Sequence, residues 1–241
     1  MMTDHPMIFS APMIRAMLDG RKTQDRRVIK DAPGPGWHCD PSPTGLRWVA
    51  DGGAPSMPVR LKYAVGDRIW ARETWADVNT SCGPGIGYKA DNDFYQPKYD
   101  GRDFGAGPSY NYKKYPGNYS MWFCDLLAGS PDHAWRSPIH MPRWASRLTL
   151  LVESVRVQRL QDISDGDARA EGISVLPLQD ADDPSAWWQS EPGEHQARTP
   201  VGSYRLLWNS LHGPDAWSLN PFVAAIGFRV IKANIDSPEA R

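Results

Sequence analysis

The sequence predicts a mixed α+β protein built around a small mixed or antiparallel β-barrel, with helices packed outside it. Three observations predict this fold class: candidate strands outnumber candidate helices, they do not alternate regularly with helices in βαβ units, and long stretches rich in proline and glycine separate the ordered segments. A chain of 241 residues can bury a sizeable core. We expect a single domain over residues 1–241, with long irregular insertions at about 31–58, 76–134 and 174–201.

The first thirty residues predict a strand, a helix and a second strand. Residues 7–9 form a short apolar run. Ser10 is a suitable helix N-cap, Pro12 suits the first helical turn, and Gly20 is the expected stop. The segment "RRVI" at 26–29 then predicts a strand.

Residues 31–58 gather proline, glycine and aspartate, which predicts a long loop. In the segment 59–75, Gly66 and Asp67 mark a turn, and the residues after them predict a strand. Residues 76–134 hold seven of the nine tyrosines. A structureless loop of that length is unusual in a compact domain, so we expect an insertion with its own local packing, in the position of a lid.

Residues 141–160 are strand-rich, and their apolar alternation changes phase at Glu153-Ser154, which predicts a bulge or a tight turn. After them, Ser164 and Asp167 have the spacing of a capping box, with Asp in place of the usual Glu, and Gly172 is a helix stop.

The segment 203–213 carries the clearest helical pattern, and we expect Ser203 before its first turn and Gly213 after its last. Its predicted apolar face consists of Tyr204, Leu207, Trp208 and Leu211. The last predicted strand, 222–231, is apolar on both faces, which is typical of a central strand.

The net charge of -1 argues against a protein held on duplex nucleic acid by bulk electrostatics. No apolar run approaches the length of a membrane span and no secretory signal pattern is present, so we expect a soluble, cytoplasmic protein. An odd number of widely spaced cysteines favours a reducing compartment. The candidate metal ligands lack paired spacing, so we expect no metal site and no cofactor. These ligands are His38, Cys39, Cys82, Cys124 and His133.

The near-neutral total hides an uneven distribution of charge. Residues 1–30 and 135–160 are basic, whereas residues 161–196 are strongly acidic. If the two basic segments meet in space, they form a pocket for a phosphate or a polar base; otherwise they are solvated faces.

Four motifs occur in an order that resembles ASCH domains, a part of the PUA-like superfamily, and the wider pattern looks like the larger ASCH proteins of bacteriophages and prophages. These motifs are "GRKTQDRR" at 20–27, "VGDRIWARETW" at 65–75, "ISDGDARAEGI" at 163–173 and "FVAAIGFRV" at 222–230. The resemblance implies a PUA-like β-barrel. It also implies one of two roles: binding of RNA or a modified nucleotide, or the amidohydrolase activity of a bacterial subfamily that deacylates N4-acetylcytidine.

The catalytic set of that subfamily is a Lys, a Thr three residues later, and a Glu near the end of the helix that follows the mid-chain strands. The resemblance carries the Lys to Lys22 and the Glu to Glu171, whereas the Thr position is occupied by Asp25. Glu171 is also unusual by itself, because the dipole at the end of a helix disfavours an anion. The alternative for Glu171 is an ordinary surface side chain.

Removal of an acyl group from an amine needs an activated nucleophile, a stabilised oxyanion and a proton for the leaving amine. A carboxylate at position 25 favours charged Lys22 over a neutral base, so we expect Lys22 to face the oxyanion. Asp25 would activate water, or would form a carboxylate pair with Glu171 that supplies both base and acid. Thr23 is a candidate nucleophile because it lies near position 25, although alternation along a strand makes a shift by two positions awkward.

Further candidates would bind the substrate. Arg26 follows Asp25 in the same motif; Tyr63, Trp75 and Trp144 would stack a base, or lie in the core. Glu73 would point into the barrel with an Arg partner, or toward solvent from an edge strand, and Arg143 would reach a phosphate or carbonyl.

Two functions therefore remain: hydrolysis of the acyl group on the N4 amine of a modified cytidine or related nucleoside, or non-catalytic binding of RNA or a modified nucleotide in a protein of phage origin. The expected partner is a small modified nucleoside or RNA.

Overall fold

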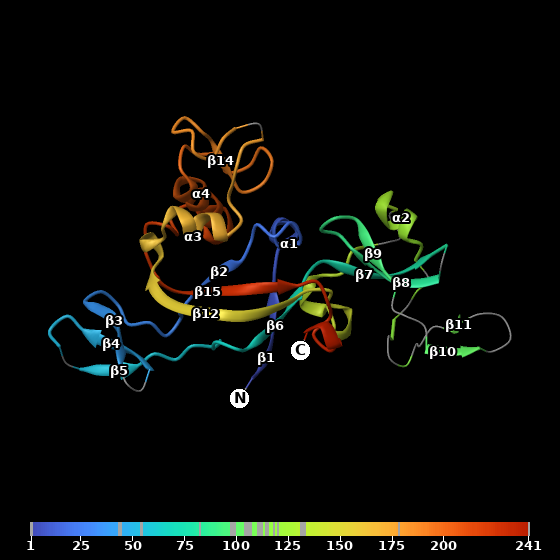
Figure 1. Ribbon diagram of the computed structural model, residues 1–241, viewed down its shortest axis with the longest axis horizontal. Helices are drawn as coiled ribbons and strands as arrows, with labels where there is room; N and C mark the ends of the chain where they lie inside the picture. Colours follow the sequence, from blue (N-terminus) through green and yellow to red (C-terminus); the bar gives the residue numbers. More distant parts are fainter. Residues whose placement is uncertain are drawn as a thin grey trace. The chain divides into compact units, whose positions relative to one another are not determined.

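The structure is a mixed α+β protein with most of its strands in several small sheets and few helices (Figure 1). It is a computed structural model. It describes residues 2–42, 45–53, 55–81, 83–96, 100–103, 108–109, 113, 116–117, 119, 121–130, 134–177 and 179–240. Cys82 and His133 lie outside these described residues. Within the described residues, every helix is too short or too polar to cross a membrane.

The chain divides into two compact units. Unit 1 contains residues 1–2, 19–67 and 151–229, and unit 2 contains residues 3–18, 68–150 and 230–241. The expectation of a single domain stays a prediction.

The longest strands belong to a five-stranded sheet with the order β1-β6-β12-β15-β2. In unit 1, β15 (Phe222–Ile231) pairs antiparallel with β2 (Gln24–Val28), so that Ile226 is opposite Asp25. The predicted central position of β15 is confirmed, because β15 lies between β12 and β2. The strand order is open, and no closed barrel is detected in the described part of the chain.

The predicted change of phase in the next strand is confirmed. β12 (Thr149–Arg159) is one continuous strand in which Val152 is buried, Glu153 and Ser154 are both exposed, and Val155 is half-buried. The alternative of a tight turn at Glu153-Ser154 is therefore wrong, and the bulge stays a prediction.

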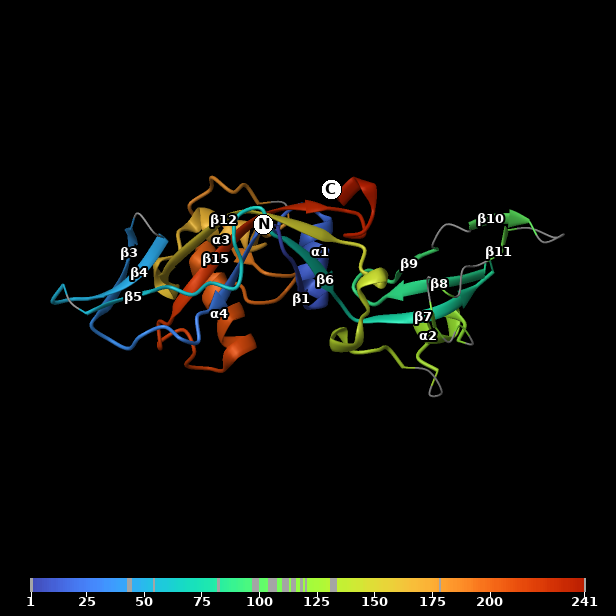
Figure 2. The ribbon, with the colours of Figure 1, turned by 90° about the horizontal axis from the view of Figure 1, so that it is seen from below.

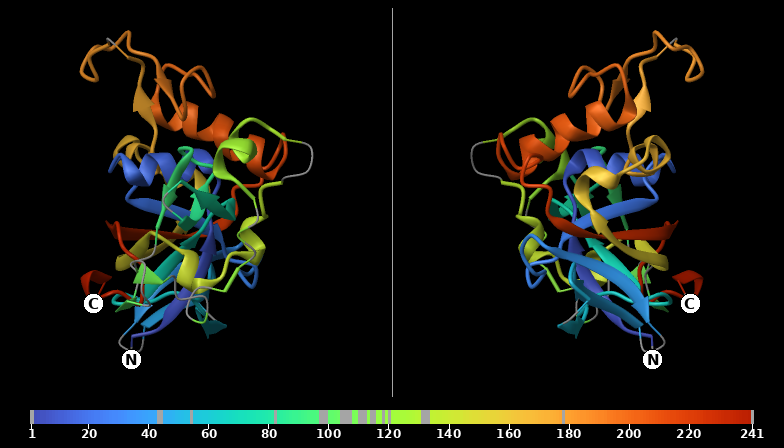
Figure 3. Two further views of the ribbon diagram at one scale, coloured as in Figure 1. Left: turned by 90° about the vertical axis from the view of Figure 1, so that its right-hand side faces the viewer. Right: turned by 90° about the vertical axis from the view of Figure 1, so that its left-hand side faces the viewer.

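Two helices of unit 1 pack together (Figure 3). α3 (Asp165–Ala170) begins after Ser164, whose hydroxyl accepts a hydrogen bond from the backbone N–H of Asp167, as predicted. α4 (Pro200–His212) begins after Thr199 rather than Ser203, because the Thr199 side chain accepts the capping bond.

The apolar core of unit 1 gathers between these helices and the sheet. It contains Leu160, Ile163, Ala168, Ile173, Trp188, Tyr204, Trp208 and Val223. Leu211 does not join it: this side chain is 48% exposed, so its predicted place on the buried face of α4 is wrong.

The prediction of a loop at 31–58 is also wrong. This segment folds into a three-stranded antiparallel sheet (Figure 2). Its strands are β3 (Trp37–Ser42), β4 (Gly45–Ala50) and β5 (Ser56–Pro58). The apolar anchor is Trp48, which is buried with its ring centroid 4.6 Å from that of Phe222. In the segment 174–201, β13 (Ser174–Val175) pairs with β14 (Trp188–Gln189).

Unit 2 contains the first strand and helix of the chain. β1 (Asp4–Ile8) pairs in parallel with β6 (Arg68–Arg72). α1 (Ala11–Leu18) follows β1 as predicted and buries Ile14 and Met17. The strand predicted after Gly66-Asp67 ends at Arg72, earlier than expected.

The segment 76–134 has its own secondary structure, as predicted, and its role as a lid stays a prediction. The strands of its sheet are β7 (Trp75–Thr80), β8 (Gly83–Tyr88) and β9 (Asp93–Tyr95). A two-stranded sheet and a short helix follow: β10 (Asp100–Asp103), β11 (Pro108–Ser109) and α2 (Phe123–Leu127). Single 3-10 turns complete the described elements at Pro138–His140, Arg143–Ala145, Leu160–Asp162 and Pro238–Ala240.

Candidate functional site

The backbone of unit 1 brings the first and third sequence motifs together. Gly20, the first residue of the first motif, has φ +76°, a conformation that favours glycine. Lys22 then forms an isolated antiparallel bridge with Glu171, and the N–H of Thr23 donates to the carbonyl of Ala170 at 2.8 Å. The two predicted catalytic residues, 149 positions apart in sequence, are thus fixed side by side by main-chain hydrogen bonds.

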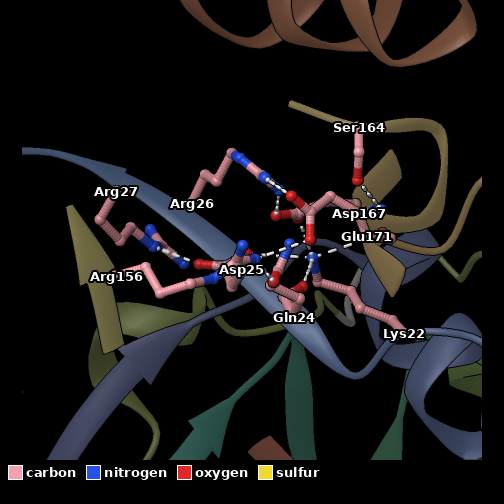
Figure 4. A network of polar contacts seen from close by, with 9 residues as sticks. All are labelled: Lys22, Gln24, Asp25, Arg26, Arg27, Arg156, Ser164, Asp167 and Glu171. Carbon is pink, nitrogen blue, oxygen red and sulfur yellow. Dashed lines mark hydrogen bonds and ion pairs between the residues drawn. The ribbon is translucent and has the colours of Figure 1, made fainter. Parts of the chain in front are cut away.

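The Lys22 ammonium is the centre of a buried polar network (Figure 4). Its Nζ donates to Oε2 of Glu171 at 2.8 Å and to the carbonyl of Gln24 at 2.7 Å, and it lies 3.1 Å from Oδ1 of Asp25. The Lys22 side chain is 1% exposed. Burial alone would lower the pKa of Lys22, but the negative charges of Glu171 and Asp25 outweigh it and raise that pKa. Lys22 is therefore a cation, as expected, and not a neutral base.

Asp25 connects the buried ammonium to a more exposed guanidinium. While Oδ1 faces Lys22, Oδ2 accepts a hydrogen bond from Nε of Arg27 at 2.5 Å. Burial opposes ionisation of Asp25, but the charges of Lys22 and Arg27 outweigh it and lower the pKa of Asp25.

Glu171 lies between two cations, with Oε2 on Lys22 and Oε1 accepting from Arg26 at 2.8 Å. Burial raises the pKa of Glu171; the charge of Lys22 opposes this, and that of Asp25 adds to it. The pKa values of the two carboxyl groups are therefore displaced in opposite directions, and the division of base and acid between them stays a prediction.

A second set of side chains surrounds this centre, and the sequence reasoning did not assign it to the site (Figure 4). Asp167 accepts hydrogen bonds from Arg26 at 3.0 Å and from Arg156 at 2.7 Å, and Arg156 also donates to Gln24 at 2.9 Å. Only half of the predicted capping box is described: the N–H of Asp167 donates to Ser164, whereas the Asp167 carboxylate accepts from Arg26 and Arg156. The Asp in place of the usual capping-box Glu was the one signal of this second role.

Tyr204 of α4 was expected in the core and is buried there, but its ring also lies 5.8 Å from the guanidinium carbon of Arg26. Burial raises the pKa of Tyr204 well above its usual value, so its phenol remains neutral.

The other candidates of unit 1 lie at the edge of the network. The side chain of Thr23 is exposed, whereas Lys22 and Gln24 on either side are buried, so the structure does not bring Thr23 to Asp25. Tyr63 is buried and close enough to Arg27 to interact with it electrostatically.

Glu73 belongs to unit 2 and has the Arg partner that burial of its carboxylate requires. Its two oxygens accept from Nε and Nη2 of Arg147, both at 2.9 Å, and Arg147 also donates to Asp91 at 2.8 Å. Burial raises the pKa of Glu73, and Arg147 opposes that rise. The guanidinium carbon of Arg147 lies 4.1 Å from the ring centroid of Tyr88, so the cluster ties Glu73 into the packing of unit 2.

The remaining candidates also lie in unit 2. Trp75 is buried in an apolar cluster and packs edge-on against half-buried Trp144, with ring centroids 6.2 Å apart. Arg143 is paired with Asp236 at 2.7 Å and with Asp4 at 2.6 Å. Within unit 2, the two Trp side chains therefore contribute to packing, and Arg143 is held in ion pairs.

No group of three or more His, Cys, Asp or Glu side chains among the described residues is placed to hold a metal ion. Of the candidate ligands, Cys39 is half-buried, and Cys124 is exposed; both are free thiols.

Comparison with protein-family models, with curated proteins and with solved structures found no match. The resemblance to ASCH domains therefore depends on the sequence motifs, and the chemistry of the site depends on the geometry of unit 1. That geometry offers one buried ammonium shared by two carboxyl groups of divergent pKa, which suits a reaction that needs a cation, a base and an acid at adjacent positions.

Proposed function

We propose that the chain is an amidohydrolase that removes an acyl group from the exocyclic N4 amine of a modified cytidine or a related nucleoside. One observation carries the proposal: Nζ of Lys22 contacts both Asp25 and Glu171 in the interior of unit 1. These are the three positions onto which the ASCH amidohydrolase motif falls. The ASCH assignment, with its PUA-like fold, and a cytoplasmic location are part of the same proposal.

The proposed reaction uses each group once. Asp25 takes a proton from water, and the water oxygen bonds to the acyl carbon. The carbonyl electron pair moves onto the carbonyl oxygen, which replaces one of the present acceptors of Lys22. The proton gained by Asp25 passes to the ionised carboxylate of Glu171 as Lys22, which touches both groups, gives one proton to Glu171 and takes one from Asp25. When the tetrahedral intermediate collapses, the C–N4 bond breaks and Glu171 delivers this proton to the leaving nitrogen.

The division of roles follows from the displaced pKa values. The pKa of Asp25 is lowered, so Asp25 is ionised at neutral pH and accepts a proton. The pKa of Glu171 is raised, which makes Glu171 the better proton donor of the two. Lys22 stays charged throughout because its pKa is raised.

The test is incubation with N4-acetylcytidine, with cytidine followed by chromatography. We expect turnover by the wild type, and a loss of about a hundredfold or more in Asp25→Asn, because an amide cannot take the proton from water. Glu153→Gln is the matched control, since Glu153 is an exposed carboxylate on β12 that pairs only with Arg229 among the contacts described. Absence of turnover by folded wild type removes the enzyme proposal, and full activity of Asp25→Asn removes the role of Asp25.

The second candidate is a non-catalytic module that binds RNA or a modified nucleotide and serves a phage. It is favoured by the contacts of Lys22, whose three N–H groups already have acceptors on Glu171, Asp25 and Gln24. Saturable, salt-sensitive binding of a short RNA, measured by fluorescence anisotropy without conversion of N4-acetylcytidine, supports this candidate over the first.

A further inference from the structure

Arg27 is the one partner of Asp25, among the described contacts, that reaches solvent. Asp25 has Lys22 on one oxygen and Arg27 on the other. The Arg27 side chain is 41% exposed, compared with 1% for Lys22. Removal of Lys22 from Asp25 would require a buried ammonium to move, whereas the Arg27 side chain already has part of its surface in solvent.

The contact with Arg27 keeps Asp25 from acting as a base. It occupies Oδ2, the oxygen that Lys22 leaves open, and the positive charge of Arg27 is one cause of the lowered pKa of Asp25. If Arg27 leaves, Oδ2 becomes available to water and the carboxylate becomes more basic. A catalytic cycle based on Asp25 is therefore faster when an anion competes for the Arg27 guanidinium.

The charge of the network indicates what the competitor is. Among the described ion pairs, four cations, Lys22, Arg26, Arg27 and Arg156, share the three carboxylates of Asp25, Asp167 and Glu171. The cluster thus has one cation in excess. In addition, Nε of Arg26 is buried and has no hydrogen-bond acceptor among the described residues. A network short of acceptors and of negative charge suits an anion, and a guanidinium is well matched to the paired oxygens of a phosphate.

We propose that Arg27 is a specificity-determining residue that binds an anionic group of the substrate, a nucleotide phosphate, and that this anion draws Arg27 away from Asp25. The preferred substrate is then an N4-acylated cytidine nucleotide rather than the neutral nucleoside. The inference has two parts. Release of Asp25 for catalysis rests on the proposed function, whereas recognition of the phosphate by Arg27 does not require turnover.

The binding half is tested by titration calorimetry with cytidine 5′-monophosphate and with cytidine. For the wild type we expect the nucleotide to bind about tenfold more tightly, the effect of one charge-assisted hydrogen bond. In Arg27→Gln the two affinities become equal. Arg229→Gln is the control, because Arg229 is an exposed arginine of β15 that pairs with Glu153 and retains the full preference. Equal affinities in the wild type, or no binding of either compound, overturn the inference.

The catalytic half is tested with N4-acetylcytidine and its 5′-monophosphate. We expect the wild type to hydrolyse the nucleotide at least about tenfold faster at low substrate concentration. Arg27→Gln abolishes this preference because it raises the rate with the nucleoside, since Asp25 is no longer covered. A merely structural role of Arg27 would lower both rates together, and that result overturns the inference.

Two results keep the two proposals distinguishable. If neither acetylated compound is hydrolysed but the nucleotide still binds more tightly in an Arg27-dependent way, the amidohydrolase proposal fails and phosphate recognition by Arg27 stands. If Arg27→Gln does not fold, Arg27→Lys replaces it: a lysine keeps the charge without the fork of donors, so the preference for the nucleotide shrinks but remains. An undiminished preference in Arg27→Lys and in Arg27→Gln contradicts the assignment to Arg27.

Discussion

Replacement of Glu171 by glutamine tests the network directly. Glu171 accepts from Lys22 and Arg26, and all three side chains are buried. Glutamine has nearly the same shape but no charge, so Glu171→Gln leaves two buried cations with one fewer counter-charge. Removal of one partner from a buried ion pair costs about 3–5 kcal/mol of the free energy of unfolding. Since single domains are stable by only about 5–15 kcal/mol, this loss is large.

The assay is urea unfolding of wild type, Glu171→Gln and the surface control Glu153→Gln, followed by circular dichroism. Glu153 pairs with Arg229 at 3.3 Å and both side chains are more than half exposed, so we expect the control to lose less than about 0.5 kcal/mol. Lys22→Met combined with Glu171→Gln should destabilise by less than the sum of the single changes, because each single change leaves a charge unpaired. If Glu171→Gln is no more destabilising than Glu153→Gln, or if the double variant is additive, the proposed contact of Lys22 with Glu171 is refuted.

Three further predictions concern the same unit. The folded-state pKa of Asp25 lies below its ordinary value of 3.8, so its stabilising contribution is present above that pH and is lost as the pH falls through the folded pKa. The free energy of unfolding should therefore fall less steeply below about pH 4 in Asp25→Asn than in wild type. Parallel curves for the two proteins would contradict this. Ser164→Ala removes the acceptor for the N–H of Asp167 and should cost about 1 kcal/mol in urea unfolding, whereas Ser164→Asp should retain most of the stability. Leu160→Ala should cost about 2–5 kcal/mol because Leu160 is fully buried, while Leu211→Ala on exposed Leu211 should cost under about 1 kcal/mol; similar losses would show that the core is placed wrongly.

Local signals in the sequence predicted the elements whose boundaries depend on nearby residues. Gly20 and Ser164 have the backbone conformation and the capping bond that their residue types favour. The strand 222–231 was recognisable because it is apolar on both faces, and burial on both faces is what a central strand requires. The capping of α4 shows the limit of such signals, since Thr199 and Ser203 are both good N-caps and the structure uses the earlier one.

The segment 31–58 shows why tertiary pairing is hard to read from one sequence. Prolines and glycines in this segment predict a loop, but prolines are tolerated on edge strands, and both β3 and β5 are edges of their sheet. The anchor of that sheet is Trp48, and its contact is with Phe222, far away in sequence. No periodicity within 31–58 contains that information.

Site residues were predictable from the sequence where a charged side chain would be unfavourable without a partner. They were not predictable where a residue already had a sufficient role in its own helix or turn. A cluster of cations at 20–27 and a glutamate at a helix end are both unfavourable alone, and the structure pairs them. Asp167 had a sufficient local role as part of a cap, which concealed its contacts with Arg26 and Arg156. Residues with two roles are therefore the ones that reasoning from sequence misses.

The substitution at position 25 changes the electrostatics of the site more than its shape. A threonine there would leave Lys22 with Glu171 as its one charged partner, and Arg27 without the carboxylate it now contacts. With Asp25, the second carboxylate raises the pKa of Lys22 and gives Arg27 a buried anion to hold. A lysine that acts as a base and an aspartate beside it are therefore incompatible choices, because each added negative charge makes the ammonium harder to deprotonate. If this protein hydrolyses an amide, its proton acceptor is a carboxylate, and the release of Asp25 from Arg27 is the step that its chemistry has to control.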